Sequence, residues 1–333
     1  MTSEPRMRLF RLVGGIVAAL CSVSIAIPLC AYAQDLYPSK PITILVGSAP
    51  GGSNDIFART LSKRLQDELG QPVIVENKPA AGGILANNLV ARAVPDGYTL
   101  VLLSSTFTTG AAIRKDLQYD AIKSFKPVAM IAKGPLLVTV NVNTPYKSLT
   151  ELIDFAKLNP KKVNYGTSGI GSINQFATEA FSQAAGIQLT HVPYKGMGPA
   201  VTDLLGGQID MIVASAPSLL SQVNTGKILA LGVTSKERAR AMPQLPTLQE
   251  AGLNGSVVDL WWGVLAPANT PDAIVERLNQ TINKIMLEQA MQNFLNKEGA
   301  QTATMTSEAF AIYIKNEIKR WQVVAHQANI QPE

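Results

Sequence analysis

Short apolar runs rich in β-branched residues alternate along this chain with segments of helical periodicity. The run from Ile42 to Val46 predicts a buried strand, and the residues after it place Phe57, Leu61, Leu65 and Leu69 four apart on one helical face. The same change of period recurs several times further along the chain. This alternation is typical of an α/β fold, in which parallel strands are covered by helices on both faces.

The first stretch of this pattern predicts one βαβαβ unit. Gly70 supplies the end of the first helix, and Val73 to Val75 forms the next expected strand. A helix from Ile84 to Val94 and a strand from Thr99 to Leu103 complete the unit. Ligands of such sheets bind at the carboxyl ends of the strands, so the loops that follow the strands are the first places to look for a site.

A second α/β unit follows. Two strands leave the first unit, Ser148 and Glu151 predict a capping box for a helix through Leu158, and strands and helices then alternate again. A strand returns to the first unit, and the rest of the chain is expected to be helical. The ranges are 128–132 and 136–142 for the leaving strands; 163–165, 189–192 and 209–213 for later strands; 172–185 and 199–205 for helices; 257–266 for the return; and 271 onward, ending with 308–326, for the final helices.

Two crossings between the units predict two hinged domains around a central cleft. We expect residues 34–135 plus 259–333 to form domain 1 and residues 136–258 to form domain 2. The fold class is therefore α/β with two domains, built mainly from parallel sheets flanked by helices.

The N-terminal segment predicts a cleavable signal peptide over residues 1–33. Arginines at 6, 8 and 11 precede an apolar run from Leu12 to Leu29, which closes on the small-x-small sequence Ala31-Tyr32-Ala33. A lone membrane anchor is the alternative, and Pro28 and the cleavage signal favour removal. Leucines precede both cysteines, which disfavours a lipid-anchored form. We therefore expect an exported protein.

Cysteine usage and charge exclude several classes of site. Both cysteines lie in the leader, so residues 34–333 hold no disulfide, thiolate metal site or cysteine nucleophile. The formal net charge is +5 at pH 7. The basic residues of the chain are scattered and lack the aromatic-plus-basic pattern of a nucleic-acid site. A mild excess of positive charge helps to steer an anionic solute toward the protein.

A glycine-rich loop joins the first predicted strand to its helix. In Ala49 to Asp55, the glycines Gly51 and Gly52 allow close approach of backbone to a ligand, and Ser53 or Asn54 can cap the helix. Free N–H groups at a helix start favour an anion. Asp55 fits better as a side chain that binds loop N–H groups and holds the loop in shape. An ordinary strand-to-helix turn is the alternative interpretation.

A second loop of the same kind occupies the same position in the second unit. It runs from Tyr165 to Ser172, and its candidate binding residues are Thr167, Ser168, Gly169 and Ser172. One such loop is weak evidence. Two loops, one in each unit and both at a carboxyl edge, can face each other across a cleft and bind one ligand between them.

Other polar segments add candidates. The row of hydroxyls from Ser104 to Thr109 ends the third strand and offers Ser105 and Thr106 as ligand partners, or it forms a solvated loop. Lys195 can pair with a carboxylate or lie on the surface. The tandem Trp261-Trp262 on the return strand either packs in the core or reaches the cleft.

Motifs for catalysis are missing. The chain has no dinucleotide fingerprint, no phosphate-binding loop with its lysine and no nucleophile elbow, and its carboxylates form no evident acid–base pair. The two histidines, His191 and His326, lack neighbours with metal-ligand spacing. We therefore predict no catalytic residues, no metal and no cofactor, and conclude that the chain is not an enzyme.

A series of short motifs resembles one family across nearly all of residues 34–333. That family is the Bug-type extracytoplasmic solute receptors of tripartite tricarboxylate transporters. The motifs are Pro50-Gly51-Gly52 with Asp55 and Arg59; Val75-Glu76-Asn77 with Ala81-Gly82-Gly83; Pro95-Asp96-Gly97-Tyr98; Tyr119-Asp120; Phe125-Lys126-Pro127; Val192-Pro193-Tyr194-Lys195-Gly196; Asp203 to Asp210; and Leu245-Pro246-Thr247 with Glu250-Ala251-Gly252.

The resemblance implies a periplasmic binding protein of the Venus-flytrap type II fold. It also implies a periplasmic monomer that captures a small carboxylate, amino acid or related compound for a membrane permease of the tripartite tricarboxylate type. A receptor that signals to a membrane sensor kinase is the alternative, because the same cleft serves both. Carried over by motif, the ligand-binding residues are Gly51, Gly52, Ser53, Asp55, Thr167, Ser168, Gly169 and Ser172.

Two departures from the family pattern bear on the ligand. Ala214 stands before Pro217-Ser218 where many relatives have an acidic residue, and this favours a ligand without an amino group. Its neighbour Ser215 joins the candidate binding residues. Gly110-Ala111 stands where Asn-Pro is usual, which leaves the shape of the loop after the third strand open.

Overall fold

A computed structural model describes residues 37–79, 81–327 and 330–331. The predicted signal peptide, 1–33, lies outside the described residues. From Tyr37 onward the chain forms one compact unit. Within this described part, no helix is long and apolar enough to cross a bilayer.

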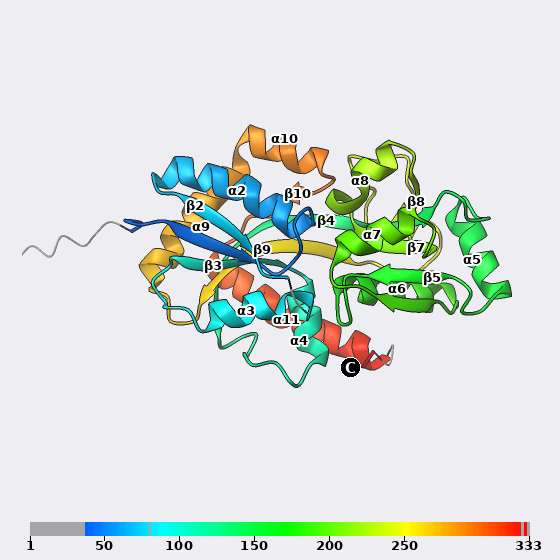
Figure 1. Cartoon of the computed structure of the whole chain (residues 1–333), viewed down its shortest axis with the longest axis horizontal. Helices are drawn as coiled ribbons and strands as arrows, with labels where there is room; N and C mark the ends of the chain where they lie inside the picture. The colour runs from blue at the N-terminus through cyan, green and yellow to red at the C-terminus, as the bar shows by residue number, and fades with distance from the viewer. Residues whose placement is uncertain (1–36, 80, 328–329, 332–333) are drawn as a thin grey trace, which may run out of the picture. The chain divides into compact units, whose positions relative to one another are not determined.

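The strands and helices alternate as the sequence predicted (Figure 1). The strands are β1 (Ile42–Val46), β2 (Val73–Asn77), β3 (Thr99–Ser104), β4 (Phe125–Asn141), β5 (Asn164–Thr167), β6 (Thr190–Pro193), β7 (Met211–Ser215), β8 (Ile228–Val233), β9 (Asp259–Pro267) and β10 (Gln301–Thr302). The helices are α2 (Ser53–Leu69), η1 (Ala81–Gly83), α3 (Ile84–Ala91), α4 (Thr106–Ile113), α5 (Leu149–Leu158), α6 (Ile173–Ala185), α7 (Met197–Leu205), α8 (Ala216–Asn224), α9 (Asp272–Leu287), α10 (Gln289–Lys297) and α11 (Ser307–Gln327).

One sheet of mixed direction carries these elements. Its order is β2-β1-β3-β9-β4-β7-β5-β6, with β8 and β10 also paired to β4. β1 is parallel to β2 and β3, and β5 is parallel to β6 and β7, whereas β9 and β4 pair with their neighbours antiparallel. The two parallel parts hold the two predicted α/β units, and the antiparallel strands are the predicted crossings. The fold class is confirmed.

Side chains of successive strand residues enter opposite cores, as the period of two requires. Ile44 of β1 packs with α2 and α9 on one face, and its neighbour Leu45 packs with α3 and α11 on the other. The tandem tryptophans divide in the same way. Trp262 lies in the first core and Trp261 in the second, and both are fully buried. The helices on the two sides of β1–β3 can be followed in Figure 1.

Three local predictions were wrong. The helix predicted to Val94 ends at Ala91, because Pro95 disfavours helical backbone in the residue before it. The alternative of a solvated loop after the third strand is overturned, because the segment from Thr106 is the helix α4, in which Thr108 and Thr109 bond back to the Ser105 carbonyl. The sequence reasoning also missed β8 and α8, two elements of the second unit.

The two strands predicted to leave the first unit are one strand, β4. Gly134 and Pro135 do not interrupt it, because they lie where β4 changes partner. Up to Pro135 it pairs with β9, and from Leu136 it pairs with β7. Proline has no N–H to give to a ladder, and it is tolerated at this position because the strand changes partner there. The division into two hinged domains at this point stays a prediction.

Candidate functional site

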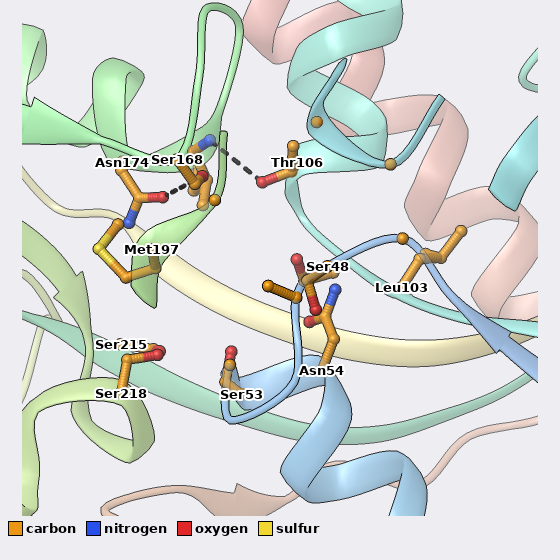
Figure 2. Close-up of a pocket in the computed structure, with 18 of the residues that line it drawn as sticks. Ser48, Ser53, Asn54, Leu103, Thr106, Ser168, Asn174, Met197, Ser215 and Ser218 are labelled. Carbon is orange, nitrogen blue, oxygen red and sulfur yellow. Dashed lines mark hydrogen bonds between the residues drawn. The ribbon is translucent and has the colours of Figure 1, made fainter. Parts of the chain in front are cut away.

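A cavity of about 100 Å³ opens where the parallel strands end (Figure 2). Its walls follow the carboxyl ends of β1, β3, β5, β6 and β7. A single water needs only about 10–15 Å³ of such space, so the cavity has room for a small organic ligand. Its polar lining includes Ser48, Ser53, Asn54, Asn87, Ser104, Thr106, Ser168, Asn174, Lys195, Ser215 and Ser218, and its apolar lining includes Leu103, Phe107, Ile173, Met197 and Leu260.

The first glycine loop is held from behind by Asp55. The N–H of Gly51 donates to Asp55 Oδ2 over 3.0 Å, and Gly51 has a φ of +81°, which favours glycine. Asp55 Oδ1 accepts from Arg59 Nε and from Asn77 Nδ2, each over 2.9 Å. Burial of Asp55 opposes ionisation, but these donors outweigh it and lower the pKa of the carboxyl group. Asp55 therefore shapes the loop and does not line the cavity.

The start of the same loop lies against η1. A Cβ atom on Gly47 would come within 2.4 Å of the Gly83 Cα atom, which only backbone movement could relieve. Both glycines line the cavity. The close approach of the two backbones therefore fixes this wall of the cavity.

Ser53, the first residue of α2, presents its hydroxyl at the cavity wall. The buried indole of Trp262 donates from Nε1 to Ser53 Oγ over 3.2 Å. An indole N–H can only donate, so Ser53 accepts this bond and keeps its own proton free. The N–H groups of Ser53 and Asn54 have no acceptor within the described part of the chain. This end of the cavity is therefore rich in donors.

Ser48 adds another hydroxyl to this wall. Its Oγ atom is buried and has no hydrogen-bond partner among the described residues. An unpaired buried hydroxyl costs free energy unless a ligand or water completes it. Ser48 is thus a cavity-lining residue with an unpaired, enclosed hydroxyl, and the sequence reasoning did not select it.

The second glycine loop presents Ser168 at the opposite wall, as Figure 2 shows. Ser168 Oγ donates to Asn174 Oδ1 over 2.8 Å, and Asn174 Nδ2 donates to the Val213 carbonyl over 2.9 Å. Asn174 follows the N-cap residue Ser172 and lies in the first turn of α6. The loop and the helix start are therefore tied to β7 through a single amide.

A network of one buried and two half-buried side chains supports this loop. His191 Nε2 lies 2.7 Å from Thr167 Oγ1, which also contacts the backbone of Gly169. The amide nitrogen of Gln175 lies near His191 Nδ1. Gln175 Oε1 accepts a hydrogen bond from the Gly171 N–H over 2.8 Å. Burial lowers the pKa of His191 to about 4, so the ring is neutral at neutral pH.

Helix α4 forms the wall between the two loops. The Ile173 N–H donates to Thr106 Oγ1 over 3.4 Å, and Thr109 Oγ1 donates to the Gly171 carbonyl over 2.7 Å. Ser105 lies behind the cavity and exchanges hydrogen bonds with the backbone of Trp261. The hydrogen bonds of Thr106 and Thr109 thereby join α4, which belongs to the first α/β unit, to the end of the second glycine loop and the start of α6.

Charge is sparse around the cavity. Lys195 is the only charged side chain among its described lining residues, and no hydrogen bond or ion pair is formed by its ammonium group within the described structure. Ala214 lies buried in the wall, and next to it Ser215 Oγ and Ser218 Oγ lie 2.9 Å apart. The described lining therefore offers no carboxylate to balance a cationic ligand.

The predicted site residues thus divide into two groups. Those that line the cavity are Gly52, Ser53, Thr106, Ser168 and Ser215, and those that do not are Gly51, Asp55, Ser105, Thr167, Gly169 and Ser172. The lining also contains residues that the sequence reasoning did not select: Ser48, Asn54, Asn87, Asn174 and Ser218. Position after a strand end was the signal that could have selected Ser48. Asn174 and Ser218 lie inside the first turns of helices and carry no comparable signal.

Residues 57–330 match the sequence model of the tripartite tricarboxylate transporter family receptor. The chain belongs to this family. It is 34% identical over 323 residues to protein BugT of Bordetella pertussis, an alignment that covers 96% of this chain and 98% of BugT. The resemblance inferred from the motifs is therefore confirmed.

Solved structures support the same assignment. The periplasmic binding protein BugD is 31% identical, with a TM-score of 0.85 over 89% of this receptor and 100% of BugD. Rpa4515 of R. palustris with adipate is 32% identical, with a TM-score of 0.87 over 89% of this receptor and 100% of Rpa4515. MatC of Rhodopseudomonas palustris with bound malate is 31% identical, with a TM-score of 0.82 over 86% of this receptor and 99% of MatC. This receptor therefore has the periplasmic binding protein fold.

Proposed function

We propose that this receptor captures a small carboxylate outside the cytoplasm and delivers it to a membrane permease of the tripartite tricarboxylate type. The chemistry of the cavity is the main support. Solved relatives that bind adipate and malate share the fold and about a third of the sequence. Cleavage of residues 1–33, a monomeric state and a role without catalysis belong to the same proposal.

The observation that carries the proposal is the set of free donors at the start of α2. Ser53 and Asn54 line the cavity, the Ser53 hydroxyl keeps its proton free, and the N–H groups of both residues have no acceptor within the described part of the chain. The positive end of the helix dipole adds to the attraction for an anion. Hydrogen bonds to a charged group contribute about 1.5–3 kcal/mol each, so a few of them reach the roughly 8 kcal/mol of micromolar binding.

The same wall argues against a ligand with an ammonium group. No aspartate or glutamate is present among the described lining residues, and the lining position before Ser215 holds Ala214, whose side chain carries no charge. Burying an unpaired ammonium group is costly. The proposed ligands are therefore carboxylates without an amino group.

A thermal-shift panel tests the proposal. The protein from residue 34 onward is melted with malate, succinate, adipate, lactate, propionate and aspartate, each beside its neutral amide where one exists. A ligand at one hundred times its Kd adds about 2.7 kcal/mol to the free energy of unfolding. For a chain of this size that raises the Tm by roughly 5 °C.

The amides are the matched control, because they keep the size of the acid and lose its charge. We expect at least one acid to stabilise the protein and its amide to have no effect. If no acid on the panel shifts the Tm, or if acid and amide act alike, carboxylate capture is refuted.

A further inference from the structure

The proton positions around Ser168 are fixed by its partner. The Val213 carbonyl can only accept, so the atom of Asn174 that faces it is the Nδ2 donor. Asn174 Oδ1 then faces Ser168, and it too can only accept. The Ser168 O–H is therefore committed to Asn174 over 2.8 Å.

Ser168 consequently offers the cavity only lone pairs. Ser168 lines the cavity, and the proton of its Oγ atom is given to Asn174 and not to a ligand. A carboxylate oxygen at this place would meet a second acceptor and be repelled. A ligand group that donates a hydrogen bond would be held instead.

The opposite wall has the reverse polarity. Ser53 accepts from Trp262 and therefore points its proton away from the indole, and the Ser48 hydroxyl is unpaired. Figure 2 shows Ser53 and Ser168 on opposite sides of the cavity, with Ser48 near Asn54. The cavity thus has a donor wall on α2 and an acceptor on the second loop.

We propose that Ser168 selects ligands that carry a hydroxyl group in addition to their carboxylate. The carboxylate lies against the donor wall, and the ligand hydroxyl donates to Ser168 Oγ. An ammonium group could also donate there, but the described lining holds no acid to neutralise it. The class of ligand is therefore a small hydroxycarboxylate, an inference that rests on the proposed function.

Matched acid pairs test this selection by isothermal titration calorimetry. Malate is compared with succinate, and lactate with propionate, because each pair differs by one hydroxyl. A site that binds a substrate hydroxyl rejects the analogue without it, since the acceptor is then left unpaired. We expect the hydroxy acid of at least one pair to bind about tenfold more tightly or better.

Two variants separate selection from affinity. Ser168→Val removes the acceptor, and we expect it to reduce the malate-to-succinate ratio of affinities toward one. Ser53→Ala, on the donor wall, is the matched control, and we expect it to weaken both acids by a similar factor and keep their ratio. A Tm within a few degrees of the parent protein verifies that each variant is folded.

Three results would overturn the inference. Equal affinity for the members of both pairs, tighter binding of the acid without the hydroxyl in both pairs, or tighter binding of aspartate than of every hydroxy acid tested would each do so. If none of the acids binds, carboxylate capture fails together with it. If the acids bind without preference for the hydroxyl, only the role of Ser168 fails.

Discussion

Replacing Asp55 by asparagine isolates the carboxylate that shapes the first glycine loop. The carboxylate accepts hydrogen bonds from Gly51, Arg59 and Asn77, and Asp55 is only 5% exposed. An asparagine has one acceptor oxygen, so its NH₂ group must face at least one of these donors. Each hydrogen bond to a charged group is worth about 1.5–3 kcal/mol, and we expect a total loss of about 2–4 kcal/mol in the free energy of unfolding.

Urea unfolding of Asp55→Asn at neutral pH measures this loss. Asp67→Asn is the matched control, because Asp67 lies on the same helix, is exposed and has no ion pair among the described contacts. Its free energy of unfolding should stay within about 0.5 kcal/mol of the parent. If the two variants lose the same stability, the loop does not depend on the carboxylate.

The pH dependence gives a second reading of the same variant. The pKa of Asp55 is lowered in the folded protein, so its contribution is present above the unfolded value of about 3.9 and is lost as the pH falls through the folded value. The stability difference between the parent and Asp55→Asn should therefore shrink in acid. A difference that keeps its neutral-pH value throughout the acid range in which the protein stays folded would refute the assignment.

Three other changes test two supports of the site and one helix cap outside it. Trp262→Phe should weaken binding of the tightest panel acid by a few-fold, because it removes the bond to Ser53 and a neutral hydrogen bond is worth about 1 kcal/mol. Trp261→Phe is the control and should leave affinity unchanged, because the Trp261 indole nitrogen has no partner within the described residues. If calorimetry finds the same loss of affinity for both variants, the role of the Trp262–Ser53 bond is refuted. The parent protein should lose stability as the pH falls from about 6.5 to 4, because burial lowers the pKa of His191 to about 4 and only the unfolded chain takes up a proton in that window. His191→Gln should remove this loss. Urea unfolding at a series of pH values measures it, with His326→Gln as the control that should keep it. Ser148→Ala should cost about 1 kcal/mol by thermal unfolding, because its hydroxyl accepts from the Glu151 N–H, and no loss would show that this cap is not needed.

Elements with a clear period were predictable from the sequence. The strand from Ile42 and the helix that ends before Gly70 were found because their apolar spacing and the left-handed glycine cap are local signals. The capping box at Ser148 was predictable for the same reason. Helix α4 was not, because its threonines disfavour a helix until their hydroxyls bond the preceding turn.

The site was predictable in outline and not in its details. The two glycine loops were selected because both follow strands, but which atoms face the cavity depends on contacts distant in the sequence. Ser53 is oriented by Trp262, 209 residues away, and Ser168 by an amide that Val213 holds in place. No spacing rule reports such contacts, so the polarity of each hydroxyl could not be read from the chain.

Strand β4 belongs to both parts of the sheet, and this has a consequence for unfolding. Its first part pairs with β9 and its second part with β7 and β8. If either part of the sheet melted alone, it would expose the unpaired edge of a strand that the other part still needs. Exposing this unpaired edge costs free energy, which disfavours a state with only one part of the sheet melted. The unit should therefore unfold in one cooperative transition and not in two steps. Calorimetry that finds equal van't Hoff and calorimetric enthalpies would show this coupling directly.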